Sequence, residues 1–573
     1  MKKNIIILLT LVLLSAVNLS AQSKVEKIDD LINRYNEYNL FNGSVLVAED
    51  GEVILKKGYG FANMEYDIPN EPKTVFRIGS ITKQFVATLI MQLVEEGKIK
   101  LDEKMTTYLP NYRKDTGDKV TLFHLLTHTS GIPSYTSIPK VWSDSLRLKY
   151  SLDYLIDNFC QGDLEFEPGK EYSYNNSGYV LLGKIVEVIT GQSLADALDE
   201  KIFKPAGMVN TGIDDERKII KNRASGYERT FDGFRRTDFF NITNAFGAGA
   251  MYSTVEDLFL WDRILYTEKI ISDETKEKMF TPYLSNYGFG WGILNVVMGK
   301  DSIKIVSHSG GLNGFNTRIT RFVDDNHTII LLNNFSGAPL GDLSKKISNI
   351  LYDEKFEYPK KSIAEHLYEI IESSDIGTAL SLYPMLKTEE GESFNFAERE
   401  LNSLGYYLLG KNRIDDAIEI FKLNIEAYPD AFNVYDSMGE AYMIAGNNDL
   451  AIKNYKKSVD LNPKNFGGIE KLKELGVEIE EPKKVDVPEQ LLNSYVGKYK
   501  LAEGFFITIT VEGNRIFEQA TGQQKFEIFP ETATKFYLKV VPAEIEFFMN
   551  DKGKVHKMVL YQNGNEMPGE KVE

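Results

Sequence analysis

One predicted helix restricts the fold of this chain more than any other feature, because it has almost no polar face. The residue spacing predicts this helix from Ser80 to Gly97, where the glycine ends it. Its apolar side chains point in nearly every direction and come from Ile81, Phe85, Val86, Leu89, Ile90, Met91, Leu93 and Val94. A helix that is apolar all round is buried centrally. The chain is therefore expected to contain a large domain that surrounds it.

That domain is predicted to be an α/β unit over residues 22–355. Gly43–Ala48 and Glu52–Lys56 flank an Asp-Gly turn, which predicts a β-hairpin. Near the other end of the domain, Ile303–Ser307 and His327–Asn333 are predicted strands on either side of a Gly-rich segment.

The first 21 residues predict a secretory signal peptide that is cleaved near Ala21. Lys2 and Lys3 precede an apolar run from Ile5 to Leu14, which is shorter than the roughly 20 residues of a membrane span. The alternative is an N-terminal anchor that stays uncleaved. We expect the mature chain to be exported, either periplasmic or extracellular, and to have no stable membrane span.

Composition argues against several classes of function. The chain of 573 residues has 66 basic and 83 acidic residues and a formal net charge of −17, which disfavours binding to nucleic acids or anionic membranes. Its single cysteine, Cys160, excludes an intramolecular disulfide framework and a multi-cysteine zinc site. The six histidines are scattered, which argues against a His-rich metal site.

After residue 360 the sequence repeats itself with a period of 34 residues. This shift places Leu401–Gly405 on Tyr435–Gly439 and Phe421 on Tyr455. The period and the helix-turn-helix pattern resemble tetratricopeptide repeats. Because two copies are fewer than the three usually needed, we expect further helices in residues 362–390.

Residues 356–475 are therefore predicted to be a helical linker followed by these repeats. The simpler interpretation is a structural spacer. The alternative is a concave surface that binds a peptide or protein partner through residues 400–465, although a short array offers little concave area.

The pattern changes again after a charged, proline-bounded linker at residues 476–489. Apolar and β-branched residues predict strands at Phe505–Val511, Phe536–Val541 and Ile545–Met549, separated by Gly and Asn turns. Residues 490–573 are therefore predicted to form a small antiparallel β domain, either a barrel or a curved sheet.

Ser80 and Lys83 open the central helix and form the first candidate catalytic pair. Positions three apart share one helix face, so the Lys83 amine can reach the Ser80 hydroxyl. A hydroxyl becomes a good nucleophile when a base takes its proton, and burial together with the helix N-terminus lowers the pKa of a lysine for that task. A second Ser-x-x-Lys, from Ser137 to Lys140, contains a proline in a turn-rich stretch and is interpreted as a surface loop.

Two further motifs carry groups that suit acyl transfer. Tyr174 precedes an apolar helix, its phenol can relay protons, and Asn176 two residues on points the same way in an extended loop. His308-Ser309-Gly310-Gly311 ends a predicted strand, where glycines let a substrate lie against the strand edge and a backbone N–H can face a developing oxyanion. Taken alone, Tyr174 is better interpreted as a packed aromatic, and the alternative for the His308–Gly311 motif is a strand-end turn.

In this order and setting, the three motifs resemble those of the serine β-lactamase and penicillin-binding-protein superfamily. The closer likeness is to class C β-lactamases, DD-peptidases and related esterases. Thr121–Ile132, Pro205–Met208 and Gly247–Thr254 are similar to further segments of that family, so the likeness covers residues 26 to about 350. It implies an antiparallel sheet flanked by helices, with an all-α subdomain.

The resemblance also implies a role for each motif residue. Ser80 would attack a carbonyl and form an acyl-enzyme, which water would then release. Lys83 and Tyr174 would share the general-base and general-acid work, and which of the two holds the proton at rest stays open.

The remaining motif residues would bind the substrate. Asn176 would hydrogen-bond the substrate amide, with His308, Ser309 and Gly310 beside it. The backbone N–H groups of Ser80 and Gly311 would form the oxyanion hole. The resemblance implies no metal or organic cofactor, and it makes His124 and His128 structural although their spacing of four suits a metal.

The strand motif departs from the family pattern, which usually has a lysine where this chain has His308. Histidine, with an unperturbed pKa of ~6.5, is mostly neutral above pH 7 and offers no lasting charge to a substrate carboxylate. This favours an ester, amide or D-amino-acid peptide as the substrate of an exported serine hydrolase. The alternatives are a β-lactamase or D-alanyl-D-alanine carboxypeptidase, a penicillin-binding-like sensor without turnover, and a repeat-based scaffold.

Overall fold

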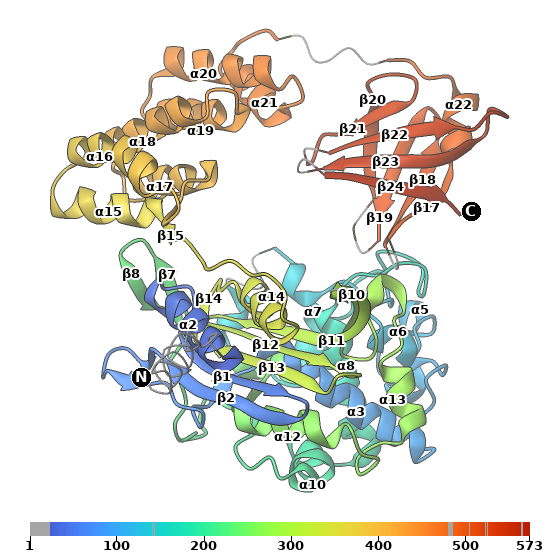
Figure 1. The fold of residues 1–573 in the computed structure, drawn as a ribbon. Helices are drawn as coiled ribbons and strands as arrows, with labels where there is room; N and C mark the ends of the chain where they lie inside the picture. The colour runs from blue at the N-terminus through green and yellow to red at the C-terminus, as the bar shows by residue number, and fades with distance from the viewer. Residues whose placement is uncertain are drawn as a thin grey trace, which may run out of the picture.

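The computed structural model describes residues 23–572, apart from residues 140, 142–143, 299, 480–484, 503–504, 522, 524, 542 and 563–564. The predicted signal peptide, the end of the second Ser-x-x-Lys motif at Lys140 and part of the charged linker lie outside the described residues. In Figure 1 the α/β domain lies below, with a helical array above it on one side and a β-barrel above it on the other.

A six-stranded antiparallel sheet, in the order β10-β11-β12-β13-β1-β2, forms the centre of the α/β domain. Its strands are β1 (Gly43–Glu49), β2 (Glu52–Tyr59), β10 (Gly292–Met298), β11 (Asp301–Leu312), β12 (Phe315–Phe322) and β13 (His327–Asn333). Because β1 pairs with β13, the first and last strands of the domain are neighbours. The predicted hairpin and the two predicted strands are confirmed.

Helices cover both faces of this sheet. They are α2 (Lys24–Glu37) and α14 (Leu340–Leu351) on one face, and α3 (Thr82–Glu95), α8 (Asn176–Thr190), α11 (Phe246–Gly249) and α12 (Val255–Ile264) on the other. Strand β1 serves both cores, because alternate side chains of a strand point in opposite directions. Val45 and Val47 pack with α2 and α14, whereas Leu46 and Ala48 pack with the other helices.

Shorter elements complete the domain and connect these layers. The helices are α4 (Met105–Tyr108), α5 (Lys114–Gly117), α6 (Leu122–Leu126), α7 (Leu152–Phe159), α9 (Leu194–Leu198), α10 (Lys204–Ala206) and α13 (Asp273–Met279). The small sheets pair β3 (Phe61–Asn63) with β4 (Ile68–Pro69), place β9 (Met251–Ser253) between β5 (Phe76–Arg77) and β6 (Gly212–Ile213), and place β7 (Tyr227–Thr230) between β14 (Phe335–Ser336) and β8 (Gly233–Arg236).

The central helix predicted from the sequence is α3, and it is buried as expected. Every residue from Thr82 to Met91 is buried, including the polar ones. One of these, Gln84, accepts a hydrogen bond from the indole nitrogen of Trp261 at 3.1 Å. The apolar pattern therefore located the middle of the domain correctly, and it leaves Lys83 away from water.

The helical array follows the 34-residue period. Its helices are α15 (Ile363–Ser373), α16 (Ile376–Glu389), α17 (Glu398–Gly410), α18 (Ile414–Ala427), α19 (Phe432–Ile444), α20 (Asn448–Leu461) and α21 (Phe466–Glu474). A Cβ on Gly405 would lie 2.5 Å from the ring of Phe421, and one on Gly439 would lie 2.9 Å from the ring of Tyr455. The repeat in sequence thus corresponds to one contact between paired helices that occurs twice. The helices expected within residues 362–390 are also present.

The C-terminal β domain is a closed antiparallel barrel of eight strands. The strands are β17 (Gly497–Ala502), β18 (Phe505–Glu512), β19 (Arg515–Ala520), β20 (Phe526–Pro530), β21 (Lys535–Leu538), β22 (Ala543–Met549), β23 (Val555–Gln562) and β24 (Asn565–Lys571), with α22 (Glu489–Tyr495) before them. Tyr495 of α22 is fully buried and stacks on Phe547 with 4.2 Å between ring centroids. Of the two sequence alternatives, the barrel is the one observed.

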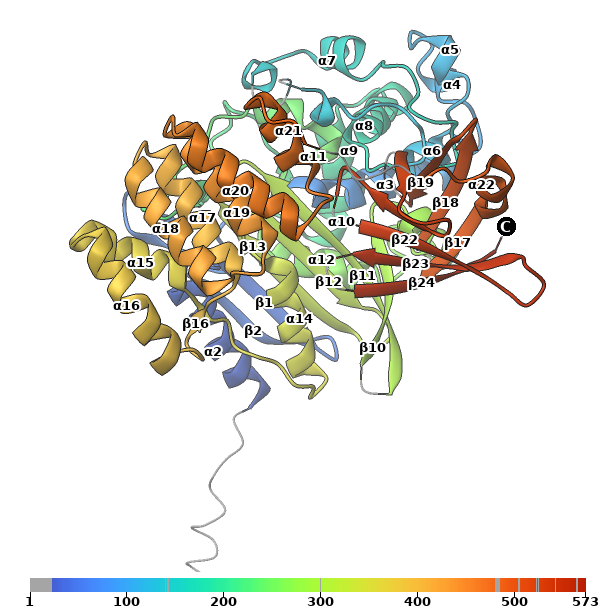
Figure 2. The same ribbon diagram turned by 90° about the horizontal axis from the view of Figure 1, so that it is seen from above.

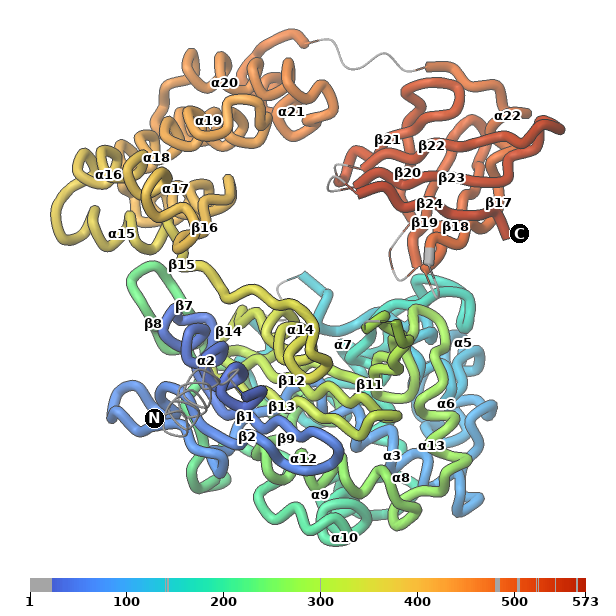
Figure 3. The backbone as a smooth tube through the Cα atoms, in the orientation of Figure 1, coloured from blue at the N-terminus to red at the C-terminus, as the bar shows by residue number. Residues whose placement is uncertain are grey.

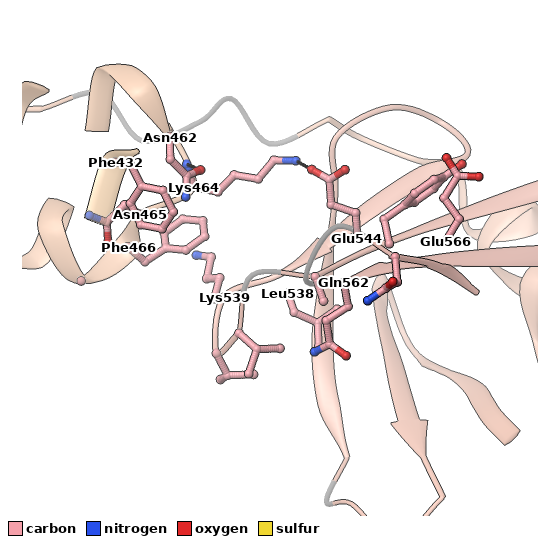
Figure 4. A pocket seen from close by; sticks show the side chains of 16 residues that line it. Phe432, Asn462, Lys464, Asn465, Phe466, Leu538, Lys539, Glu544, Gln562 and Glu566 are labelled. Carbon is pink, nitrogen blue, oxygen red and sulfur yellow. Dashed lines mark hydrogen bonds and ion pairs between the residues drawn. The ribbon is translucent and has the colours of Figure 1, made fainter. Parts of the chain in front are cut away.

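The barrel contacts the end of the helical array. Lys464 forms ion pairs with Glu544 and, at 3.1 Å, with Glu531 of the barrel, while Phe466 stacks on Tyr537 with 5.6 Å between ring centroids. Figure 4 shows Lys464, Phe466 and Glu544 among the residues that line a cavity of about 570 Å³ between the two parts.

The barrel also contacts the α/β domain. Gln519 on β19 donates a hydrogen bond to Glu171, three residues before Tyr174. Figure 2, seen from above, shows the array and the barrel on either side of α14. Among the helices that the structure describes, none has the length and apolar character needed to cross a membrane.

Candidate active site

Ser80 lies in a 3₁₀ turn, Gly79–Ile81, directly before α3. Strand β5 leads into this turn, and α3 begins two residues after Ser80, so the hydroxyl stands at the N-terminus of the buried helix. Ser80 is half-buried, whereas Lys83 one turn later is fully buried. The two side chains meet as the spacing predicted, with 3.0 Å between Lys83 Nζ and Ser80 Oγ.

The Lys83 amine has two further partners, both of which are oxygen acceptors. Its Nζ lies 2.8 Å from Asn176 Oδ1 and 2.8 Å from the backbone oxygen of Ala248. A neutral amine has two hydrogens and one lone pair. Since a carbonyl oxygen accepts and never donates, a neutral amine that gives its two hydrogens to these oxygens would direct its lone pair at Ser80.

Burial lowers the pKa of Lys83 well below its ordinary value. The described residues place no carboxylate within ion-pair distance of this amine, so no described acidic group opposes the lowering of its pKa. Burial therefore favours the neutral form of Lys83, and the geometry places its amine within hydrogen-bond distance of the Ser80 hydroxyl.

Tyr174 lies beside this pair and keeps contact with solvent. Its side chain is 37% exposed, and Lys83 Nζ lies 4.8 Å from the centre of its ring. Withdrawal of the hydroxyl from bulk water raises the pKa of Tyr174, and the neighbouring Ser80 hydroxyl acts in the opposite direction. The phenol therefore stays protonated at neutral pH.

Asn176 is the first residue of α8, so the helix start points its amide at the site. The amide oxygen accepts from Lys83, and its Nδ2 donates to Thr136 Oγ1 at 2.9 Å. Ser134 in the same loop accepts from the backbone N–H of Asn176 at 3.2 Å. The loop before α7 thus fixes which way the amide faces.

The edge of β11 is free where the third motif lies. Strand β10 ends its pairing at Gly292, opposite Ser307, and no described strand pairs with residues 308–312 on that side. On its other side β11 continues to pair with β12, with Gly311 opposite Asn316. A substrate can therefore lie along this edge, as the sequence predicted.

Gly310 and Gly79 allow this edge of β11 to lie against the 3₁₀ turn that contains Ser80. A Cβ on Gly310 would lie 2.0 Å from the oxygen of Ile78, and one on Gly79 would lie 2.9 Å from the nitrogen of Gly311. Gly79 also has a φ of +53°, which favours glycine. The backbone of the turn that contains Ser80 is therefore in direct contact with β11 at Gly310 and Gly311.

His308 points into the domain and uses both ring nitrogens within the protein. Nδ1 lies 2.6 Å from the oxygen of Ser309, which only accepts, so Nδ1 carries the hydrogen. Nε2 then accepts from the hydroxyl of Tyr287 at 2.9 Å. Burial lowers the pKa of His308 to about 3. The ring is therefore neutral, and both nitrogens are already engaged.

The structure thus brings Ser80, Lys83, Tyr174, Asn176, Gly310 and Gly311 together, and the His308 ring lies beside that of Tyr174 with 6.2 Å between ring centroids. The ring of His308 faces Tyr287, and the side chain of Ser309, the next residue along the strand, is exposed.

Sequence reasoning missed several residues that shape the site. The backbone oxygen of Ala248, the hydroxyl of Tyr287 and the hydroxyl of Thr136 all contact motif residues. Only Ala248 had a signal, since it lies in a segment that resembles the family. The others belong to loops whose position depends on the fold.

His124 and His128, which were interpreted as structural from the sequence, each accept a hydrogen bond from a backbone N–H group. Nδ1 of His124 accepts from the N–H of Thr121 at 3.2 Å, and Nδ1 of His128 accepts from the N–H of Asn175 at 3.1 Å. Among the described residues, no group of three His, Cys, Asp or Glu side chains is placed to hold a metal ion.

Comparison with known families matches each part of the chain. The β-lactamase family matches residues 28–348, the tetratricopeptide repeat family matches residues 432–465, and a domain of unknown function, DUF3471, matches residues 481–571.

Individual proteins that are similar to this chain include a penicillin-binding protein and a hydrolase. Penicillin-binding protein 4* of Bacillus subtilis (strain 168) is 27% identical over 565 residues, which are 95% of this chain and 98% of the relative. The teichoic acid D-alanine hydrolase of Staphylococcus aureus is 32% identical over 269 residues, or 47% of this chain and 62% of that protein.

Among solved structures, a D-amino acid amidase from Ochrobactrum anthropi SV3, complexed with L-phenylalanine amide, aligns with a TM-score of 0.51 and 25% identity. The alignment covers 57% of this chain and 97% of the amidase. The comparisons of fold and of sequence thus agree with the geometry of the site. There, a buried lysine lies below a serine at a helix N-terminus, beside a tyrosine and a free strand edge that contains glycines. The chain belongs to the β-lactamase family and is a serine hydrolase of the β-lactamase and penicillin-binding-protein type, with tetratricopeptide repeats and a C-terminal eight-stranded barrel.

Proposed function

We propose that this protein is an exported hydrolase that cleaves D-aminoacyl esters or amides through an acyl-enzyme on Ser80. The observation that carries the proposal is the set of partners of Lys83, two acceptors and one hydroxyl around a buried amine. Export is supported by the N-terminal sequence alone.

The acylation step follows from the protonation states. Lys83 takes the proton of Ser80 as Oγ bonds to the substrate carbonyl carbon. The negative charge that develops on the carbonyl oxygen is stabilised by the N–H groups of Ser80 and Gly311. Tyr174 donates its proton to the departing alcohol or amine, so the bond to the leaving group breaks without forming a free anion.

Deacylation reverses these roles with water. A water molecule gives a proton to the Tyr174 phenolate that acylation leaves and bonds to the acyl carbon, and Lys83 returns the proton that it took to Ser80 Oγ as the acid leaves. Because burial pushes the pKa of Lys83 down and that of Tyr174 up, one group starts as the base and the other as the acid.

The neutral His308 supports the substrate class. A substrate with a free carboxylate beside the scissile bond benefits from a lasting positive charge, and the His308 ring provides none. Esters and amides of a D-amino acid lack that carboxylate. The names of two similar proteins, a teichoic acid D-alanine hydrolase and a D-amino acid amidase, also indicate this class.

A second candidate is a penicillin-binding peptidase of the DD-type. It is favoured by the similarity to penicillin-binding protein 4*, which extends over 95% of this chain, including the array and the barrel. On this alternative, penicillin would acylate Ser80 and the adduct would be released slowly.

The test is a substrate panel with wild type and Ser80→Ala. It contains nitrophenyl esters, amides of D- and L-alanine, a D-alanyl-D-alanine peptide and nitrocefin, and it includes mass spectrometry after a fluorophosphonate probe. We expect a probe adduct on Ser80 and faster turnover of D- than of L-aminoacyl substrates. A folded protein without an adduct, or with equal rates for Ser80→Ala, rejects the proposal.

A further inference from the structure

The helical array holds the tip of one hairpin of the α/β domain. This hairpin consists of β7 and β8 and rises toward α15 and α17 in Figure 3. At its tip, Phe231 packs against Tyr407 and Tyr368, with 4.9 and 5.9 Å between ring centroids. Asp232 accepts hydrogen bonds from both tyrosine hydroxyls and from Lys411 Nζ, the last at 2.6 Å.

Charge strengthens this contact. Hydrogen bonding from Lys411 and from the two tyrosines lowers the pKa of Asp232 to about 2, so the carboxylate is ionised throughout the neutral range. Lower on the same hairpin, Arg229 forms an ion pair with Glu365 of α15. Two helices of the array thus hold the hairpin at two levels.

The base of the hairpin lies against the turn that follows the free edge of β11. Gly226 precedes β7, and a Cβ on Gly314 would lie 2.6 Å from the Cα of Gly226. Nδ2 of Asn313 donates to the backbone oxygen of Asp238 at 3.2 Å. The hairpin base therefore packs against the turn at the end of β11, three residues beyond Gly311.

A cavity of about 540 Å³ lies at this junction. Thr237 and Asp238 at the hairpin base contribute one wall, and Leu312 and Asn313 contribute another. Arg77, three residues before Ser80, also lines it. The lining therefore includes Leu312, the residue after Gly311, and a residue of β5, the strand that leads into the turn containing Ser80.

The charged groups in this cavity already have partners. Arg77 pairs with Asp214 at 2.7 Å and with Glu216 at 3.2 Å, and Arg223 pairs with Asp214 at 3.2 Å. A charged ligand group would have to compete with these ion pairs. The lining therefore suits an uncharged polar group.

We propose that the helical array sets the substrate selectivity of the hydrolase by holding the β7–β8 hairpin, so that the cavity beside Gly311 receives an uncharged polar portion of the substrate. This rests on the proposed function, since the cavity matters only if Ser80 is the nucleophile. Releasing the hairpin tip leaves every group at Ser80 unchanged but lets one wall of the cavity move.

The test compares two double variants of the full chain. Phe231→Ala with Asp232→Ala removes the tip contacts. Glu419→Ala with Lys422→Ala removes an exposed ion pair within α18 and is the matched control. Each is assayed with two pairs of D-alanyl substrates, one pair differing in leaving-group length and one in acyl length, with hydroxyl or amide groups in the extension.

We expect the tip variant to change the KM ratio of long to short substrate about three- to tenfold in one of the pairs. Its rate of labelling by a small fluorophosphonate should stay within about twofold of wild type, because chemistry at Ser80 is intact. Hydrogen exchange should increase in residues 233–240, and the control variant should match wild type in every assay.

The outcomes separate the two proposals. Failure of wild type to label at Ser80 rejects the proposed function. Normal labelling, with faster exchange in residues 233–240 and unchanged KM ratios, overturns the role of the array. If the double variant does not fold, Asp232→Asn, which removes the charge and replaces one acceptor oxygen by an NH₂ group, takes its place, and the same pattern of results overturns the inference.

Discussion

His128 accepts hydrogen bonds from the residues on either side of Tyr174 and packs against the Tyr174 ring. The backbone oxygen of His128 accepts from the N–H of Ser173 at 2.9 Å, and its Nδ1 accepts from the N–H of Asn175 at 3.1 Å. The His128 and Tyr174 rings lie 4.3 Å apart, centroid to centroid. His128 is fully buried and has a φ of +58°, an uncommon conformation for a histidine. One residue therefore sets where the phenol stands.

Replacing His128 by alanine should lower kcat about 10- to 100-fold, because a small displacement of a catalytic group is costly. His124→Ala is the matched control. Its Nδ1 caps the start of α6, so it should lose about 1 kcal/mol of stability with little change in kcat. Steady-state kinetics and thermal unfolding of both variants distinguish these effects. Equal kcat values for the two variants would contradict the role given to His128.

Gly79→Ala should abolish most activity, whereas Gly97→Ala should not. Both glycines have positive φ, +53° and +68°, so both substitutions carry similar backbone strain. A Cβ on Gly79 would also lie 2.9 Å from the nitrogen of Gly311, while a Cβ on Gly97 meets nothing within 4 Å. Separating Gly311 from Ser80 weakens the oxyanion hole, so we expect a loss of about 100-fold or more in kcat.

Activity of both glycine variants is measured on the same nitrophenyl ester, with circular dichroism to confirm folding. A folded Gly79→Ala enzyme with wild-type kcat would show that catalysis does not need the contact between β11 and the turn that contains Ser80.

The pH profile of kcat/KM should have an acid limb that belongs to Lys83. Protonation of the amine removes the lone pair that faces Ser80, so activity falls as pH decreases through the pKa of this group. Because burial lowers the pKa of Lys83 well below its ordinary value, the limb should lie well below that of an exposed lysine.

Tyr174→Phe provides the control for that assignment. It should lower the rate at every pH and leave the acid limb in place, since burial raises the pKa of the phenol and keeps it protonated there. Disappearance of the limb in Tyr174→Phe would assign it to the tyrosine instead.

Stability should decrease as pH falls from about 6.5 toward 3, with His308 as one cause. Its pKa is lowered to about 3 in the folded protein, so the unfolded chain binds a proton in this range and the folded chain does not. The contribution present above pH 6.5 is lost at up to about 1.4 kcal/mol per pH unit. His308→Gln should flatten the slope of Tm against pH, and His556→Gln, at an exposed position, should not. Parallel slopes for all three proteins would exclude His308 as the cause.

Much of the architecture could be predicted from short stretches of sequence. The apolar pattern of α3, the spacing of Ser80 and Lys83, the β1–β2 hairpin and the 34-residue period all depend on contacts between residues that are near in sequence or repeat regularly. The structure confirms each of these, because a local period determines which face of an element is apolar before any tertiary contact forms.

The site itself depended on chain segments that meet only in the folded domain. Lys83 finds Asn176 and Ala248 at separations of 93 and 165 residues, and His308 turns inward because Tyr287 lies there to donate to it. No pattern in the sequence indicated that His128 fixes the position of Tyr174, or that the helical array holds the tip of the β7–β8 hairpin. Residue identity determined which groups could react, while burial and long-range hydrogen bonds determined which are charged and where they point, since both arise only when distant segments pack together.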